Sequence, residues 1–174
     1  GHKGTFGRVY IYGGSEGYTG APAYAGEAAV RTGSGLVFVG VPEDVYPIVA
    51  ARCLGAMVHP VPEDYAEQIA RIAACDAVLI GPGLGRCWWA EERVLALLRD
   101  LECPVVLDAD GINAAAAHID VLPGRRAPTV LTPHEAEFRR LGGDLSPGRE
   151  EAAAAFARKH GCVLALKGPR TVVA

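Results

Sequence analysis

Short runs of apolar, mostly β-branched residues alternate along the chain with longer alanine-rich segments whose apolar positions recur at helical spacing. The runs are typical of buried parallel strands, and the longer segments of the helices that cross over between them. The expected strands are Arg8 to Tyr12, Leu36 to Val41, Ala56 to Pro60, Ala77 to Ile80, Val105 to Asp108, Thr129 to Leu131 and Val163 to Lys167. The expected helices are Ala21 to Thr32, Val45 to Ala51, Tyr65 to Ala73, Trp89 to Leu101, His134 to Leu141 and Pro147 to His160. We therefore expect an α/β fold, a doubly wound and mostly parallel sheet flanked by helices.

The last part of the chain carries two further local signals. Ser146 is of a type that caps helices, and Pro147 suits the first helical position, so the final helix is expected to begin there. A second short β-prone run, Thr171 to Ala174, ends the sequence with nothing after it to cover the strand. We therefore expect a sheet that is incomplete at its C-terminal end, and an exposed edge that favours a homo-oligomer.

Composition narrows the class of protein. The chain has 174 residues, half of them hydrophobic, which suits a single domain over residues 1–174. Its formal charge of −3 provides no broad basic surface, so nucleic acid and membrane surfaces are not expected partners. No apolar run approaches the ~20 residues that span a bilayer, and no signal peptide is visible at the start, so we expect a soluble cytoplasmic protein. The five scattered cysteines lack a CxxC pair and are expected to be reduced and structural.

Glycine-rich segments follow two of the expected strands. In open parallel sheets, ligands bind at the carboxyl ends of strands, so these positions are candidates for a site. Gly13 to Ala29 and Ile80 to Arg86 could bring backbone amides close to a phosphate or ribose, and they equally suit tight turns with close packing. Gly83 and Gly85 do not form a Rossmann dinucleotide motif, because that motif would follow the first strand and be trailed by an acidic residue about 20 positions later.

Titratable side chains follow three later strands. Asp108 and Asp110 lie at one strand end, and strand alternation predicts that both side chains point to one side. Asp110 could cap the next helix, or one of the two carboxylates binds hydroxyls or a hydrated magnesium ion. His134 suits a sugar or nicotinamide contact, and is alternatively a structural residue at a helix start. Lys167 and Arg170 suit a polyphosphate, or are simply exposed charges. Four strand ends are expected to converge on one cleft, namely Gly13 to Ala21, Gly81 to Gly85, Asp108 to Asn113 and Thr132 to His134.

Six segments, taken in order, carry a resemblance to a known family: GTFGRVYIYGGSEGYTGAP, AAVRTGSGLV, IGPGLG, VVLDADGIN, LTPHEAEF and VLALKGPRTVVA. They closely resemble the bacterial ADP/ATP-dependent NAD(P)H-hydrate dehydratases of the ribokinase-like superfamily, over essentially the whole chain. Each motif is only moderately specific, but their common order and spacing make the resemblance strong. One departure is that Glu135 and Ala136 stand where family members have proline and glycine.

The resemblance implies a lyase that uses ADP or ATP, with Mg²⁺, to dehydrate the S epimer of hydrated NADH or NADPH. Its small-molecule partners would be NAD(P)H hydrate and the adenine nucleotide. The hydrate-binding positions implied are Ala21, Gly85 and His134, to which we add Asp110 and Asn113 from their place at a strand end. The nucleotide positions implied are Lys167, Gly168, Pro169, Arg170 and Thr171.

The catalytic residue is expected to lie outside this sequence. Family members place their catalytic aspartate in a GSGD-type motif, which is not present up to Ala174. The chain is therefore expected to be the amino-terminal part of the domain, with no catalytic residue of its own and little activity alone, and its metal ligands are unassigned. Two alternatives stay open, a vitamin or sugar kinase of the same superfamily and an inactive nucleotide-binding fragment.

Overall fold

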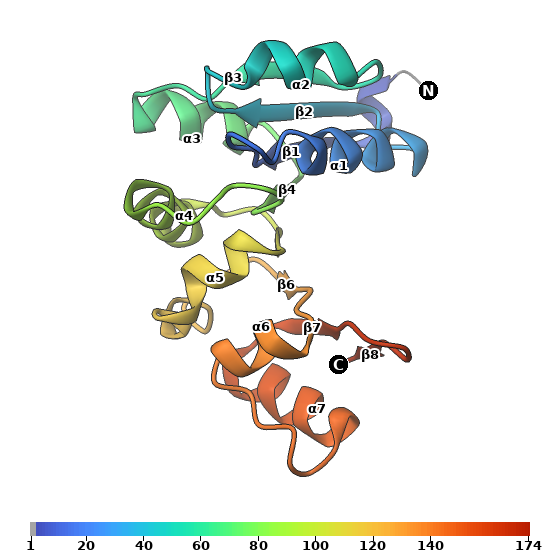
Figure 1. Cartoon of the computed structure of the whole chain (residues 1–174), viewed down its shortest axis with the longest axis vertical. Helices are drawn as coiled ribbons and strands as arrows, with labels where there is room; N and C mark the ends of the chain where they lie inside the picture. Colours follow the sequence, from blue (N-terminus) through green and yellow to red (C-terminus); the bar gives the residue numbers. More distant parts are fainter. Residues whose placement is uncertain (1–2) are drawn as a thin grey trace. The chain divides into compact units, whose positions relative to one another are not determined.

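A computed structural model describes residues 3–174. The described residues form two compact units, one ending at Gly85 and the other spanning Arg86–Ala174, each with its own strands and helices (Figure 1). The expected α/β class is confirmed, because strands and helices alternate and the strands pair in parallel except at the last one.

The first unit is a four-stranded parallel arrangement in the order β3-β2-β1-β4. Its elements are the 3-10 helix η1 (Lys3–Phe6), β1 (Arg8–Tyr12), α1 (Gly20–Arg31), β2 (Leu36–Val41), α2 (Tyr46–Arg52), β3 (Met57–Pro60), α3 (Tyr65–Ala73) and β4 (Ala77–Ile80). Alternation divides the strand side chains between two faces. Ile11 and Val39 pack in one core cluster with Ala23 of α1 and Val49 of α2. Tyr10 and Phe38 point the other way and line a cavity beside α3.

The second unit has the strand order β5-β6-β7-β8. Its elements are α4 (Trp88–Asp100), β5 (Val105–Leu107), α5 (Asp110–Ala116), the 3-10 helix η2 (Ile119–Val121), β6 (Thr129–Leu131), α6 (Glu135–Arg140), α7 (Arg149–His160), β7 (Val163–Leu166) and β8 (Val172–Val173). The first three strands are parallel, and β8 pairs antiparallel with β7. Phe138 of α6 and Phe156 of α7 meet at 5.2 Å between ring centroids, which joins these two helices through buried aromatic area.

Most expected elements are confirmed to within two residues, but two expectations are wrong. Helix α7 begins at Arg149 and its N-cap is Gly148, not Ser146. The Ser146 hydroxyl and amide instead bind the Asp144 carboxylate at 2.6 and 2.9 Å, so a local turn competes successfully for this capping residue.

Helix α5 is absent from the expected elements. The chain leaves β5 through Ala109, whose φ of +49° and ψ of −115° are unusual for a residue with a side chain, and enters the helix at Asp110. Strand alternation therefore stops at Leu107, so the expectation that Asp108 and Asp110 share one side as strand neighbours is wrong.

His160 makes the folding stability of the second unit depend on pH. Burial beside Phe156, with ring centroids 4.4 Å apart, lowers the pKa of His160, and the neighbouring Lys159 lowers it further. As the pH falls through about 6.5, this histidine binds a proton in the unfolded chain but not yet in the folded chain. The contribution of neutral His160 to the free energy of unfolding is therefore fully present above that pH and is lost as the pH is lowered. We expect His160→Leu to flatten this acid-side loss in urea titrations at several pH values. The exposed His118→Gln serves as the control, and an equally steep loss in both variants would contradict the assignment.

Candidate functional site

The two glycine-rich segments of the first unit pack directly against each other. The Gly14 amide donates to the Pro82 carbonyl at 2.9 Å, and the Ser15 hydroxyl donates to the Gly83 carbonyl at 2.8 Å. The loop after β1 and the loop after β4 are thus fixed to one another at the carboxyl ends of adjacent strands. This confirms that two of the expected strand ends meet.

Glycine is required in these loops by the protein's own packing. A Cβ on Gly13 would lie 2.3 Å from the Pro82 carbonyl oxygen, and one on Gly83 would lie 2.6 Å from the Tyr18 carbonyl oxygen. The amides of Gly13, Gly14 and Tyr18 all donate to carbonyls within the unit. The close-packing interpretation therefore holds for these positions, and these three amides do not form an anion-binding surface.

Ala21 and Gly85, the expected hydrate-binding positions, both belong to this loop pair. The Ala21 methyl lies 3.2 Å from the Cβ position of Gly83. Gly85 has a φ of +79°, and a Cβ there would lie 3.2 Å from the Ser15 hydroxyl. The pair thus presents small residues on a rigid backbone, which lets a flat ligand approach closely.

In the second unit, polar side chains from three strand ends meet around one amine. We call Asp108, Thr132, Glu137 and Lys167 the Lys167 cluster. The Lys167 ammonium donates to Asp108 Oδ1 at 2.8 Å, and the Thr132 hydroxyl donates to the same oxygen at 2.7 Å. Asp108 follows β5, Thr132 follows β6 and Lys167 follows β7, so the parallel order of these strands brings the three together.

Glu137 places a buried carboxylate at the edge of this cluster. Its side chain is 7 % exposed, and Oε2 accepts from the His134 amide at 2.8 Å and lies 4.0 Å from the Lys167 ammonium. His134 completes a capping box, because its Nδ1 accepts from the amides of Ala136 and Glu137 at 3.1 and 3.2 Å. With Nδ1 used as an acceptor, the ring proton lies on Nε2, which lies 3.5 Å from Glu137 Oε1, and the side chain of His134 is 52 % exposed.

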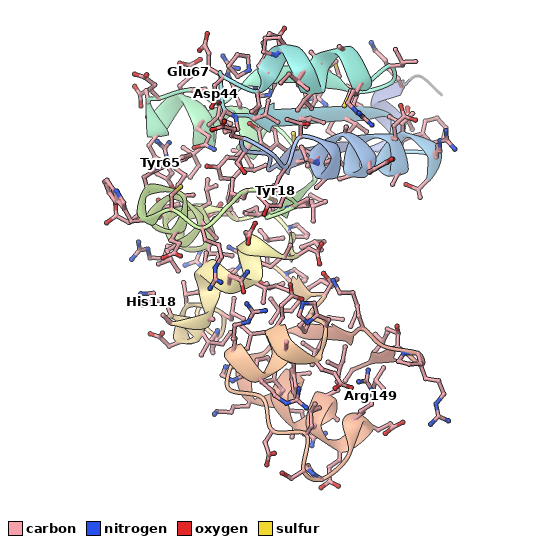
Figure 2. All side chains as sticks on the ribbon, viewed as in Figure 1. Tyr18, Asp44, Tyr65, Glu67, His118 and Arg149 are labelled. Atoms are coloured by element: carbon pink, nitrogen blue, oxygen red, sulfur yellow. The ribbon has the colours of Figure 1, made fainter. Side chains whose placement is uncertain are left out.

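The Lys167–Thr171 turn rests on Arg149, the first residue of α7, which Figure 2 labels. Its guanidinium donates to the Leu166 and Lys167 carbonyls at 3.0 and 3.1 Å and pairs with the Glu135 carboxylate. A Cβ on Gly168 would lie 2.6 Å from the same guanidinium, so a larger residue there would displace the end of the Arg149 side chain. Glu135 stands at a position where the family that this sequence resembles has proline, and here it forms an ion pair with Arg149. Pro169, Arg170 and Thr171 are exposed along the turn.

Asp110 and Asn113 lie together on the first turn of α5. The Asn113 amide donates to the Asp110 carboxylate at 3.1 Å. The side-chain oxygen of Asn113 is buried without a hydrogen-bond partner among residues 3–174, which leaves one acceptor for a ligand.

The structure adds residues that the sequence interpretation left out of its site. Glu137 was detectable from its spacing, three residues after His134, which is the capping-box pattern. Asp108 as the partner of Lys167, and Arg149 beneath the turn, carried no local signal, because 59 and 18 residues separate the bonded groups. The convergence of all four strand ends on one cleft stays a prediction.

The donor set suits a magnesium ion that binds mainly to a nucleotide. Among residues 3–174 no group of three or more His, Cys, Asp or Glu side chains is arranged to hold a metal ion. Mg²⁺ commonly keeps several waters and takes its remaining ligands from one or two carboxylates and substrate phosphates. These strand ends fit that mode, with no cage built from the protein alone.

Comparison with known proteins gives consistent matches. The family model for NAD(P)H-hydrate dehydratase matches residues 9–174. The bifunctional NAD(P)H-hydrate repair enzyme of Moorella thermoacetica is 42 % identical over 100 % of this chain and 35 % of its own length. The ATP-dependent (S)-NAD(P)H-hydrate dehydratase of Caenorhabditis briggsae is 34 % identical over 80 % of this chain and 46 % of its own. The chain thus spans about a third of the length of the bacterial relatives.

Solved structures agree with these relatives. The ADP/ATP-dependent NAD(P)H-hydrate dehydratase of Bacillus subtilis, co-crystallized with ATP/Mg²⁺, superimposes with a TM-score of 0.78 and 31 % identity, covering 100 % of this chain and 62 % of that one. A ribokinase-like superfamily protein of Enterococcus faecalis gives a TM-score of 0.83 at 27 % identity, covering 99 % and 61 % of the two chains. The fold is therefore ribokinase-like, and the chain belongs to the NAD(P)H-hydrate dehydratase family.

Proposed function

We propose that this chain provides substrate-binding loops and the nucleotide turn of an enzyme that dehydrates the S epimer of hydrated NADH or NADPH with ADP or ATP and Mg²⁺. Family membership supports this class of reaction. The observation that carries the assignment to these residues is the Lys167 cluster, in which one ammonium at a strand end contacts Asp108 at 2.8 Å beside the Glu137–His134 capping box.

The hydroxyl group of the hydrate is a poor leaving group and must first be activated. Transfer of the terminal phosphoryl group forms a bond from phosphorus to that oxygen and breaks the phosphoanhydride bond, which releases AMP from ADP. The carbon–oxygen bond then breaks, phosphate departs, and loss of a ring proton restores the dihydronicotinamide. Lys167 offers a positive charge to the transferring group, since its present partner Asp108 is one-third exposed and a phosphate can compete for the amine. The half-exposed ring of His134, whose Nε2 lies 3.5 Å from Glu137 Oε1, offers a polar contact to the hydrate.

A vitamin or sugar kinase of the same superfamily would share the phosphoryl transfer but retain the phosphorylated alcohol. The family match favours the dehydratase over this kinase and over an inactive fragment. A direct test uses the natural protein that contains this sequence. We expect it to regenerate NADH absorbance from S-hydrated NADH only when ADP or ATP and Mg²⁺ are both present, with one phosphate released per NADH. A stable phosphorylated product without NADH would contradict the proposal.

Cellular setting and assembly belong to the same proposal. Within residues 3–174 no helix is long and apolar enough to cross a bilayer. A cytoplasmic location, where nicotinamide cofactors are used, fits the proposed repair activity. We expect a homo-oligomer, which light scattering of the natural protein would detect.

A further inference from the structure

The largest cavity described in the second unit lies apart from the Lys167 cluster. It has a volume of about 530 Å³, within the usual range for small-molecule sites, and runs along helices α4 and α5 to the end of α6. None of the four residues of the Lys167 cluster lines it. We call this cavity the Trp88 groove.

An exposed aromatic ring forms one wall of the groove. Trp88, the first residue of α4, is 72 % exposed and lines the groove, whereas its neighbour Trp89 is 47 % exposed and does not. An indole that stays exposed along a cavity provides a flat surface on which a base can stack without regard to base identity. The following turns of α4 and α5 supply the apolar Leu95 and Ala114.

Polar groups around this wall suit a nucleoside. Glu91 and Glu92 line the groove, and carboxylates accept hydrogen bonds from ribose hydroxyls. Arg86 and Arg140 line it as well, with the charge that attracts phosphate. Asn113 contributes the buried side-chain oxygen that has no partner among residues 3–174 and can accept from an amino or hydroxyl group.

The sequence connects this groove to a position expected to bind the hydrate. Trp88 follows Gly85 by three residues, and Asn113 is itself an expected substrate contact. A dinucleotide carries an adenosine half that takes no part in the dehydration and must be held elsewhere than at the reacting ring. We propose that the Trp88 groove binds the adenosine half of the hydrated dinucleotide, with the adenine stacked on Trp88 and the ribose on Glu91 or Glu92. This inference rests on the proposed function for the identity of its ligand.

Binding can be measured without turnover because the sequence has only two tryptophans. The variants are made in the natural protein, with any tryptophan outside this sequence replaced. Trp89→Phe then reports the emission of Trp88 alone, and Trp88→Phe reports that of Trp89 alone. NAD⁺ is titrated into each variant, with nicotinamide mononucleotide as the probe that lacks adenosine. We expect NAD⁺ to quench Trp88 saturably, nicotinamide mononucleotide to leave it unchanged, and Trp89 to respond to neither. Equal quenching of both tryptophans, or no saturable quenching of Trp88, would overturn the proposal.

Steady-state kinetics provide the second arm. Trp88→Ala is expected to raise KM for S-hydrated NADH by about 5- to 150-fold, the loss of one stacked base, and to leave KM for hydrated reduced nicotinamide mononucleotide unchanged. Trp89→Ala is the matched control and should change neither. Quenching of Trp88 without any dehydratase activity would refute the proposed function and leave the groove assignment standing. A Trp88→Ala variant that binds NAD⁺ normally but changes mass in light scattering would show that Trp88 contacts another subunit, and would overturn the proposal.

Discussion

Replacement of Lys167 by alanine is expected to lower kcat/KM of the natural protein for S-hydrated NADH with ADP by ~10²–10³, the usual cost of removing one preorganised charge-stabilising donor. The ammonium is the one cation that the structure places within 2.8 Å of Asp108 and 4.0 Å of Glu137 in the described part of the second unit. Its loss leaves these carboxylates facing the nucleotide phosphates without compensation, so both the affinity for ADP and the rate of phosphoryl transfer should fall.

The stability of Lys167→Ala separates a local charge effect from unfolding. Lys167 and Asp108 are 44 % and 32 % exposed, so their ion pair contributes little to folding and Tm should change by only a few degrees. The exposed Lys159→Ala in α7 removes a charge of the same sign from the same unit and should keep full activity. Activity of Lys167→Ala within threefold of the unmodified protein would show that the cluster does not serve the nucleotide.

Replacement of Gly13 by alanine is expected to lower the stability of the first unit strongly. The new methyl group would lie 2.3 Å from the Pro82 carbonyl oxygen, which belongs to backbone fixed by its bond to the Gly14 amide. Forcing the two loops apart should lower the free energy of unfolding by about 3 kcal/mol, the upper end for overpacking. Tm should then fall by roughly 6–12 °C in calorimetry.

Gly20→Ala is the matched control for this loop. It lies at the first position of α1, and the nearest atom to its Cβ is 4.0 Å away, so alanine fits there and should be neutral or slightly stabilising. A Gly13→Ala protein as stable as Gly20→Ala would mean that the loops after β1 and β4 are not packed as described.

The sequence predicted the strands and helices well where buried and exposed positions alternate regularly along a short segment. The bounds of β1, β2, β4 and β6 agree residue for residue with the expected strands, because each is a short run rich in apolar residues between glycine, proline or polar residues. Helix α5 was not predicted because its start depends on the backbone conformation of Ala109, and a pattern of apolar residues does not indicate a dihedral angle. The prediction for Ser146 was wrong because its side chain can either cap a helix or bind the Asp144 carboxylate in a turn, and the sequence does not indicate which of the two forms.

The candidate site was predictable as positions but not as contacts. Residues after strands were identified because parallel strands place their carboxyl ends at one edge. Which side chains pair there depends on strand order, which the sequence does not state. Asp108 was therefore passed over in favour of Asp110, although it is Asp108 that bonds to Lys167 at 2.8 Å.

The turn at Ala109 stores backbone strain next to the Lys167 cluster. A residue with a side chain at φ +49° and ψ −115° costs of order 1–3 kcal/mol, and glycine would relieve that strain. Ala109 lies between Asp108, which binds the Lys167 ammonium, and Asp110, which opens α5, so a more flexible residue there would loosen two carboxylates that we expect to serve the site. Stabilising substitutions in this protein should therefore be sought on the outer faces of its helices, away from the strand ends whose strained backbone positions these carboxylates.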